Sequence, residues 1–172
     1  PYLAIFDRGA VKERKLIIDT LNHDKSPSRR SAAVFLMGHF TDPNDIITQL
    51  LPHVNDPDAG VRNNVMRVIA MTIKKAKITG IDVKPFLKLL QSPIDTDRNK
   101  ALYVLYGVAD SAQEKAVIIQ EGSNDLLALL RLTQPNNHKL AYDILQKISG
   151  KNYGEYDFQA WGPWVEEAKK QV

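Results

Sequence analysis

One amphipathic helical pattern recurs four times along the chain, and it constrains the fold more than any other feature. The four copies align on a column of basic residues, which are Arg30, Arg62, Arg98 and His138. The third, sixth, seventh and tenth positions after this column are mostly apolar, and those spacings share one side of an α-helix. The residues that we expect to be fully buried on this basis are Val68, Ile69, Val104 and Leu105.

A second apolar helix is expected before each copy, so the repeated unit is a helix, a short polar turn and another helix. These preceding helices are expected over residues 11–21, 44–54, 83–90 and 124–132. Ser26-Pro27 and Asp42-Pro43 each pair a capping side chain with a proline suited to the first helical position. Ser123-Asn124-Asp125 is expected to cap the helix that begins near Leu126. Alternating strand patterns are scarce, so the sequence predicts an all-α fold.

Composition excludes several classes of protein. The 172 residues contain no cysteine, which excludes disulfides, thiolate zinc sites and a cysteine nucleophile. A cysteine-free chain is compatible with either a cytoplasmic or an exported protein, so the compartment stays open. No apolar run approaches the roughly 18–20 residues that span a bilayer. The formal net charge is only +3.

Motifs for catalysis or cofactor binding are absent from the sequence. It contains no HExxH, no GxSxG and no phosphate-binding glycine loop. Paired acids such as Asp56 and Asp58 fall in turns, where capping the next helix explains them. His39 is expected to make a local hydrogen bond near Asp42. We therefore expect neither a catalytic role nor a cofactor nor a metal site.

The turn between the two helices resembles that of a known repeat family. Residues 50–62 read LLPHVNDPDAGVR, similar to the LLPLLxDPDxxVR turn of the HEAT-repeat family and its shorter bacterial relatives. Looser copies occupy residues 17–30, 86–98 and 126–138. The resemblance implies a right-handed α-α superhelix, a solenoid of about four helical pairs over residues 1–150. It also implies that the recurrent arginine reaches a turn acid of the neighbouring repeat, such as Asp56.

The two ends of the chain differ from the repeats. Residues 151–172 contain both tryptophans, and we expect this segment to be a C-terminal cap in which Trp161 and Trp164 pack on the last helical pair. An aromatic ligand pocket is the alternative. Residues 1–10 are expected to be an N-terminal cap or the remnant of an earlier repeat.

The candidate binding surface is the side of each second helix opposite its buried stripe, which faces the concave side in stacked helical pairs. Its residues lack glutamate and combine aromatic rings with arginine and asparagine, a composition typical of protein interfaces. The predicted protein-binding residues are Phe35, Asn63, Arg67, Lys74, Asn99, Tyr103 and Tyr106. The alternative is that these rings pack on neighbouring repeats.

The expected function is a non-catalytic, monomeric scaffold that binds a protein or peptide. The alternative is a nucleic-acid-binding module, because some HEAT-like proteins are DNA glycosylases with a basic concave groove. In that case residues such as Arg67, Lys74 and Lys75 would contact phosphates. A third alternative is an accessory subunit, like the HEAT-like subunits of bilin lyases.

Overall fold

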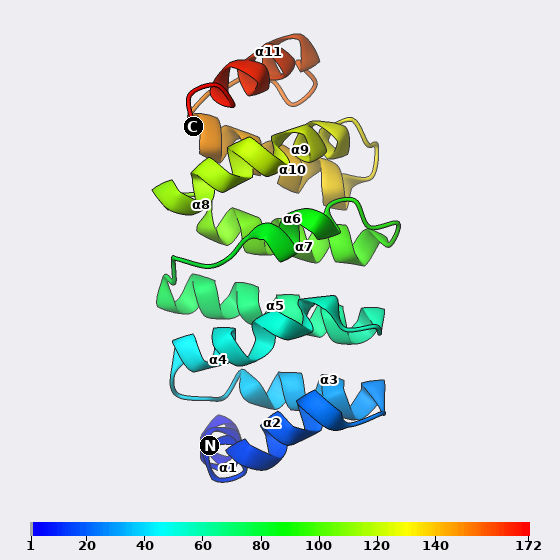
Figure 1. Cartoon of the computed structure of the whole chain (residues 1–172), viewed down its shortest axis with the longest axis vertical. Coiled ribbons are helices and arrows are strands. Elements are labelled where there is room, and N and C mark those ends of the chain that lie inside the picture. The colour runs from blue at the N-terminus through cyan, green and yellow to red at the C-terminus, as the bar shows by residue number, and fades with distance from the viewer. Residues whose placement is uncertain (1) are drawn as a thin grey trace. The chain divides into compact units, whose positions relative to one another are not determined.

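The computed structural model describes residues 2–172 and is entirely helical, with no strand in that range (Figure 1). Pro1, the first residue of the expected N-terminal cap, lies outside the described residues. The chain divides into two compact units, unit 1 over residues 1–78 and unit 2 over residues 79–172. Among the described residues, no helix has the length and apolar character needed to cross a membrane.

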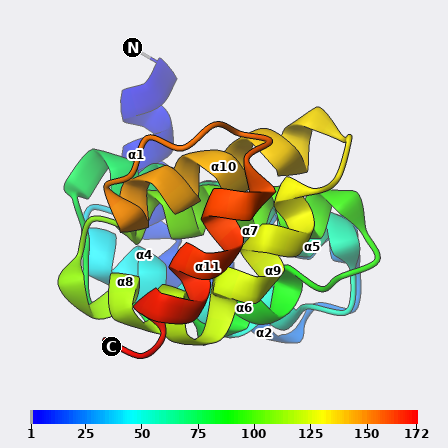
Figure 2. The same cartoon turned by 90° about the horizontal axis from the view of Figure 1, so that it is seen from above.

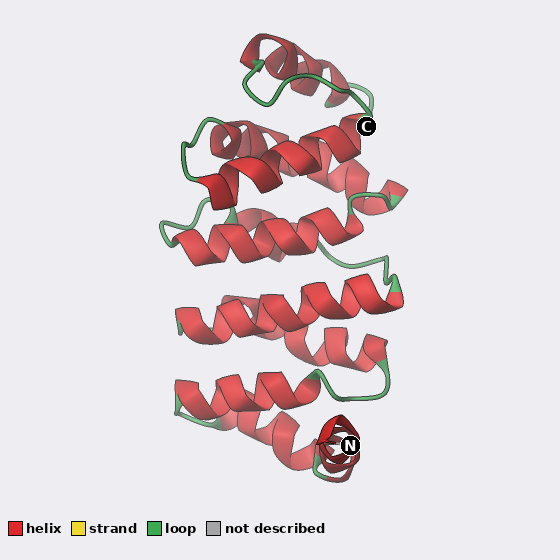
Figure 3. Ribbon diagram, turned by 180° about the vertical axis from the view of Figure 1, so that it is seen from behind, coloured by secondary structure: helices red, strands yellow, loops and turns green. Residues whose placement is uncertain are grey.

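Unit 1 consists of two packed helical pairs preceded by one further helix. Its elements are α1 (Tyr2–Lys12), α2 (Arg14–His23), α3 (Pro27–Met37), α4 (Pro43–Leu50), the 3₁₀ turn η1 (Leu51–Asn55) and α5 (Ala59–Ala76). Helix α2 packs on α3, α4 and η1 pack on α5, and α3 packs on α5. The layer of α2 and α4 is nearer in Figure 1, and the layer of α3 and α5 is nearer in Figure 3. In Figure 2, α1 (dark blue) extends beyond the other helices of unit 1.

Unit 2 also contains two helical pairs, followed by a final helix. Its elements are α6 (Lys84–Leu89), α7 (Asp95–Val108), α8 (Ala112–Val117), the π-helical turn η2 (Ile118–Gly122), α9 (Ser123–Leu130), α10 (Pro135–Ser149) and α11 (Phe158–Ala168). Helix α6 packs on α7, α9 packs on α10, and α7 packs on α10. Helix α11 covers α9 and η2.

Expected helix caps are confirmed at Ser26, Asp42 and Asp58, and the Asp58 carboxylate accepts from the backbone N–H of Val61 at 3.0 Å. The Ser26 hydroxyl accepts from the backbone N–H of Arg29 at 3.4 Å, and the Asp42 carboxylate accepts from that of Asn44 at 2.9 Å. The expected cap at Ser123 is wrong. Helices α8, η2 and α9 follow one another without a break, and the buried Ser123 hydroxyl donates to the Ile119 carbonyl at 2.6 Å. A serine hydroxyl within a helix can donate to a carbonyl of the preceding turn. The sequence alone does not distinguish such a serine from one that caps a helix.

The buried stripe was predicted correctly at most positions and wrongly at Val68. Ile69, Val104 and Leu105 are fully buried, whereas Val68 is only half-buried. In unit 1, Val34 and Met66, four positions after the arginine column, are fully buried instead. At 100° per residue, burial of the fourth position instead of the sixth rotates the buried stripe of α3 and α5 by roughly 40° from the predicted direction. The sixth position then lies at the edge of the stripe. In unit 2 the sixth position stays buried, as at Val104 and Ile144.

The C-terminal segment folds onto the last helical pair of unit 2. Trp161 is fully buried, and its ring meets that of Tyr142 on α10 edge to face, with centroids 6.2 Å apart. Its indole N–H donates to the Gly154 carbonyl at 2.9 Å, so the polar group of this buried side chain is satisfied. Trp164 is half-buried against Trp161. The expected packing of Trp161 on the last pair is therefore confirmed.

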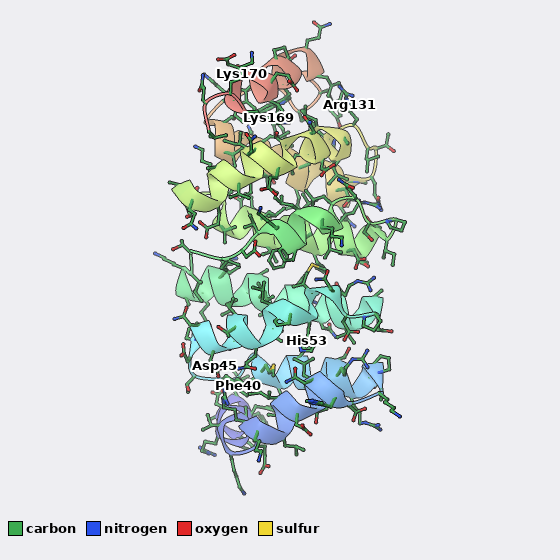
Figure 4. The ribbon with its side chains drawn as sticks, in the orientation of Figure 1. Phe40, Asp45, His53, Arg131, Lys169 and Lys170 are labelled. Atoms are coloured by element: carbon green, nitrogen blue, oxygen red, sulfur yellow. The ribbon has the colours of Figure 1, made fainter. Side chains whose placement is uncertain are left out.

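Polar contacts link the first helices of the two pairs of unit 1, away from the candidate surface. Asp45 on α4 and Phe40 after α3, labelled in Figure 4, both contact Arg14 of α2. The guanidinium lies 2.7 Å from the Asp45 carboxylate and 5.6 Å from the centroid of the Phe40 ring. The hydrogen bond from Arg14 lowers the pKa of Asp45 below its ordinary value. His53 of η1 is likewise 2.8 Å from the amide oxygen of Asn22 on α2.

Candidate interaction surface

The recurrent arginines have a structural role that explains much of the basic column. In each of three turns, Nη1 of the arginine donates to the carbonyl oxygen six residues earlier: Arg30 to Asp24 at 3.0 Å, Arg62 to Asp56 at 2.8 Å, and Arg98 to Ser92 at 2.7 Å. The guanidinium therefore closes the turn between the two helices of its own pair. These three positive charges lie at the turns rather than on the candidate surface.

Arg30 also makes the expected contact with the turn of the next pair. Its Nε and Nη2 donate to the two carboxylate oxygens of Asp56 at 2.9 and 2.8 Å, and both side chains are buried. Burial raises the pKa of Asp56, but the hydrogen bonds from Arg30 and from the Asp58 backbone N–H outweigh it and hold the pKa below its ordinary value. The expectation that the arginine reaches Asp56 is confirmed within unit 1.

On the exposed side of α3 and α5, unit 1 presents apolar and basic side chains together. Phe35 is 62% exposed and Met71 is 65% exposed, and the exposed Arg67 and Lys74 lie on the same side of α5. We call Phe35, Arg67, Met71 and Lys74 the unit 1 face. Of these, Met71 was not predicted from the sequence. The predicted exposed positions were the first, fifth, eighth and twelfth after Arg62, and Met71 is the ninth. Met71 is four residues after Arg67, a spacing that places both on one side of the helix.

Asn63 lies one turn before Arg67 on α5 and is half-buried rather than open. Its amide oxygen is buried without a hydrogen-bond partner among the described residues. Burying an unpaired carbonyl oxygen costs free energy, and this oxygen is closed to solvent, so it is not an open contact point on the surface. This is the one predicted binding residue of unit 1 that carries an unsatisfied buried atom.

Phe35 contacts the N-terminal helix through His39. The rings of Phe35 and His39 meet edge to face with centroids 5.7 Å apart, and His39 stacks on Phe6 of α1 at 5.4 Å. His39 Nδ1 is 2.9 Å from the Asp7 carboxylate. The expected partner, Asp42, caps α4 instead, so that expectation is wrong; the long-range contact with α1 has no signal in local spacing.

In unit 2 the predicted residues Asn99, Tyr103 and Tyr106 are engaged by their own neighbours. The Lys100 ammonium lies 5.3 Å from the centroid of the Tyr103 ring. The Asn99 amide donates to the Asn136 carbonyl at 2.9 Å, which links α7 to the start of α10. Both rings remain partly exposed, Tyr103 at 48% and Tyr106 at 41%.

Lys147 of α10 accounts for the environment of Tyr106. Its ammonium lies 4.2 Å from the Tyr106 ring centroid, donates to the Tyr106 carbonyl at 2.8 Å and pairs with Asp110 at 2.9 Å. Lys139 and Asp143, also on α10, form an ion pair one turn apart. On the candidate surface of unit 2, hydrogen bonds and an ion pair therefore connect α7 to α10.

Two buried ionisable groups outside the candidate surface have structural partners. Glu114 accepts from Ser111, from the Gly80 N–H and from the Ile81 N–H, the last at 2.9 Å. Burial raises the pKa of Glu114, but these hydrogen bonds outweigh it and lower the pKa below its ordinary value. His138 lies between the Leu130 carbonyl at 2.6 Å and the Glu155 carboxylate at 3.1 Å. Over residues 2–172, no group of three or more histidines and acids is arranged to hold a metal ion.

Comparison with known proteins adds no assignment. The chain matches no protein-family model and no curated protein.

Proposed function

We propose that this protein is a non-catalytic scaffold that binds a protein or peptide on the exposed side of its second helices. The observation that carries the proposal is the unit 1 face, where Phe35 and Met71 are more than half exposed beside Arg67 and Lys74. Large apolar side chains exposed together with arginine are typical of interfaces, where they are desolvated on binding. Tyr103 and Tyr106 supply further partly exposed rings on unit 2. The half-buried Asn63 of unit 1 and Asn99 of unit 2 add polar side chains beside them.

We further propose that the two units belong to a HEAT-like right-handed superhelix with an aromatic C-terminal cap. Support comes from the repeated helical pairs in each unit and from the arginine contact that closes three of their turns. The buried Trp161 on α11 supports the capping role of the C-terminal segment. In such an array the second helices would form one concave surface.

The alternative is a nucleic-acid-binding module, and one observation favours it. Lys74, Lys75 and Lys77 are exposed near the end of α5, as is Arg67 in its middle. Against it, Arg30, Arg62 and Arg98 are engaged by turn carbonyls, so the recurrent arginines are not available as a column of phosphate contacts.

Site-specific photocrosslinking tests the scaffold proposal. A photoreactive amino acid placed at Phe35 or Tyr103 should capture the same protein from extracts of cells that express this chain. Unlabelled protein should compete, and the Arg67→Ala, Tyr103→Ala double variant should not. Leu16, exposed on α2, is the matched control position and should capture nothing specific. Equal capture at Leu16, or capture of nucleic acid instead of protein, would contradict the proposal.

A further inference from the structure

The small net charge of the chain conceals an uneven distribution between the two units. Residues 1–78 contain twelve Lys and Arg against eight Asp and Glu, whereas residues 79–172 contain eleven against twelve. All of the excess positive charge therefore belongs to unit 1. A local excess of this kind attracts a partner of opposite charge and speeds its association.

Within unit 1 the two kinds of charge are separated by layer. Helices α3 and α5 contain no acidic residue, and every acid of the unit lies in α1, α2, α4 or a turn. Arg29 and Arg30, at the start of α3, are paired with Asp24 and Asp56. Arg67, Lys74 and Lys75 on α5 make no hydrogen bond or ion pair with any described residue. The second-helix layer thus presents cations that no carboxylate of its own surface neutralises.

Apolar groups accompany these cations on the unit 1 face. Met71 lies one turn from Arg67 and less than one turn from Lys74, and Phe35 on α3 holds the position equivalent to Arg67 on the adjoining α5. Methionine is flexible and polarisable, which lets it adapt to different apolar partners. A binding segment that satisfied this face would need both carboxylates and apolar side chains.

We propose, on the basis of the scaffold function above, that the unit 1 face binds an acidic peptide segment anchored by an apolar side chain. Carboxylates of the segment pair with Arg67, whose guanidinium accepts a bidentate contact, and with Lys74. The apolar side chain packs between Phe35 and Met71. A peptide fits better than nucleic acid because half of the face is apolar, whereas phosphate binding requires many cations.

Random copolymers supply a probe without knowledge of the natural partner. A fluorescently labelled glutamate–tyrosine copolymer should bind the full chain at low salt, and binding should weaken at physiological salt. Polyglutamate should bind at least several-fold more weakly because it lacks an anchor, and a lysine–tyrosine copolymer should not bind. Fluorescence anisotropy measures all three.

Variants locate the binding on the structure. Arg67→Glu should raise the dissociation constant for the glutamate–tyrosine copolymer at least about tenfold, since it replaces an attraction by a repulsion. Met71→Ala should raise it by a smaller factor. The matched control, Lys15→Glu with Leu16→Ala, makes the same kind of change at exposed positions of α2 and should leave binding unchanged. Circular dichroism checks that each variant is folded.

Three outcomes overturn the proposal: no binding of the copolymer, equal weakening by the α2 control, or tighter binding of a short DNA duplex that Arg67→Glu abolishes. The last would favour the nucleic-acid alternative. If the copolymer fails but a photoreactive group at Phe35 still captures a protein, the acidic chemistry is wrong and the scaffold function stands. If both fail, the scaffold function fails as well.

Discussion

In unit 2 the exposed rings on α7 lie beneath lysines of the same unit, whereas in unit 1 the corresponding helices present cations without such partners. Lys147 covers Tyr106 and pairs with Asp110, but Arg67 of α5 is engaged by no described residue. The ends of the chain show the same contrast. Helix α11 buries Trp161, while Leu3 and Ile5 of α1 are more than half exposed and Phe6 is nearly half exposed. On the exposed side of the second helices, the rings of unit 2 contact lysines of the same unit, whereas Arg67 and Lys74 of unit 1 contact no described side chain of opposite charge.

The largest difference is expected at the two terminal helices. Trp161→Ala should lower the free energy of unfolding by about 3–5 kcal/mol, because it removes a fully buried aromatic side chain. Phe6→Ala should cost less than about 1 kcal/mol, since nearly half of Phe6 is already in contact with water. Urea denaturation followed by far-UV circular dichroism measures both. Equal losses would show that α1 is covered as well as α11.

A second comparison concerns equivalent valines six positions after the arginine column. Val104→Ala should cost about 2–3 kcal/mol, from about 0.8 kcal/mol for each methylene removed and a further cost for the cavity. Val68→Ala should cost about 1 kcal/mol or less, because Val68 is half-buried. Thermal or urea unfolding distinguishes the two. A loss at Val68 as large as at Val104 would mean that the unit 1 stripe is not rotated.

Glu114 should make the stability of unit 2 sensitive to acid. Its pKa is lowered in the folded state, so its contribution is complete above the ordinary value of 4.5 and is lost as the pH falls through the lowered value. Glu114→Gln should cost about 1 kcal/mol at neutral pH, the difference between charged and neutral hydrogen bonds. The variant should also flatten the acid limb of the curve of unfolding free energy against pH. Parallel curves for the variant and the wild type would contradict this role.

The smallest effect is expected at Lys147. Lys147→Ala removes a cation–π contact, a hydrogen bond to the Tyr106 carbonyl and an ion pair with the exposed Asp110, which together contribute about 0.5–1 kcal/mol. Affinity for the glutamate–tyrosine copolymer should stay unchanged, since the binding cations lie on α5. A large loss of copolymer binding would instead place the acidic partner on unit 2.

The sequence predicted the helical pairs because each carries its own periodic signal, and it predicted the core where that signal is unambiguous, as at Leu105. It missed Met66 and misplaced Val68, because the direction of a buried stripe depends on the helices that pack against it. Apart from Met71, the positions on the exposed side of these helices were predicted from the helical period alone. Their partners were not, because Lys147 and Tyr106 are 41 residues apart. The role of Glu114 was also missed, since its donors lie more than thirty residues away in the chain.

The connection between the units has a consequence for proteolysis. Glu114 fixes the backbone at Gly80 and Ile81, whereas Lys77, just before it, is exposed and ends α5 in a left-handed conformation with φ of 53°. Trypsin cleaves after lysine, and an exposed basic residue where a helix ends is a favourable place for a first cut. Brief digestion should therefore cleave after Lys77, with a fragment of residues 78–172 among the first products. Gel electrophoresis would then show the boundary between unit 1 and unit 2 as a single early cleavage.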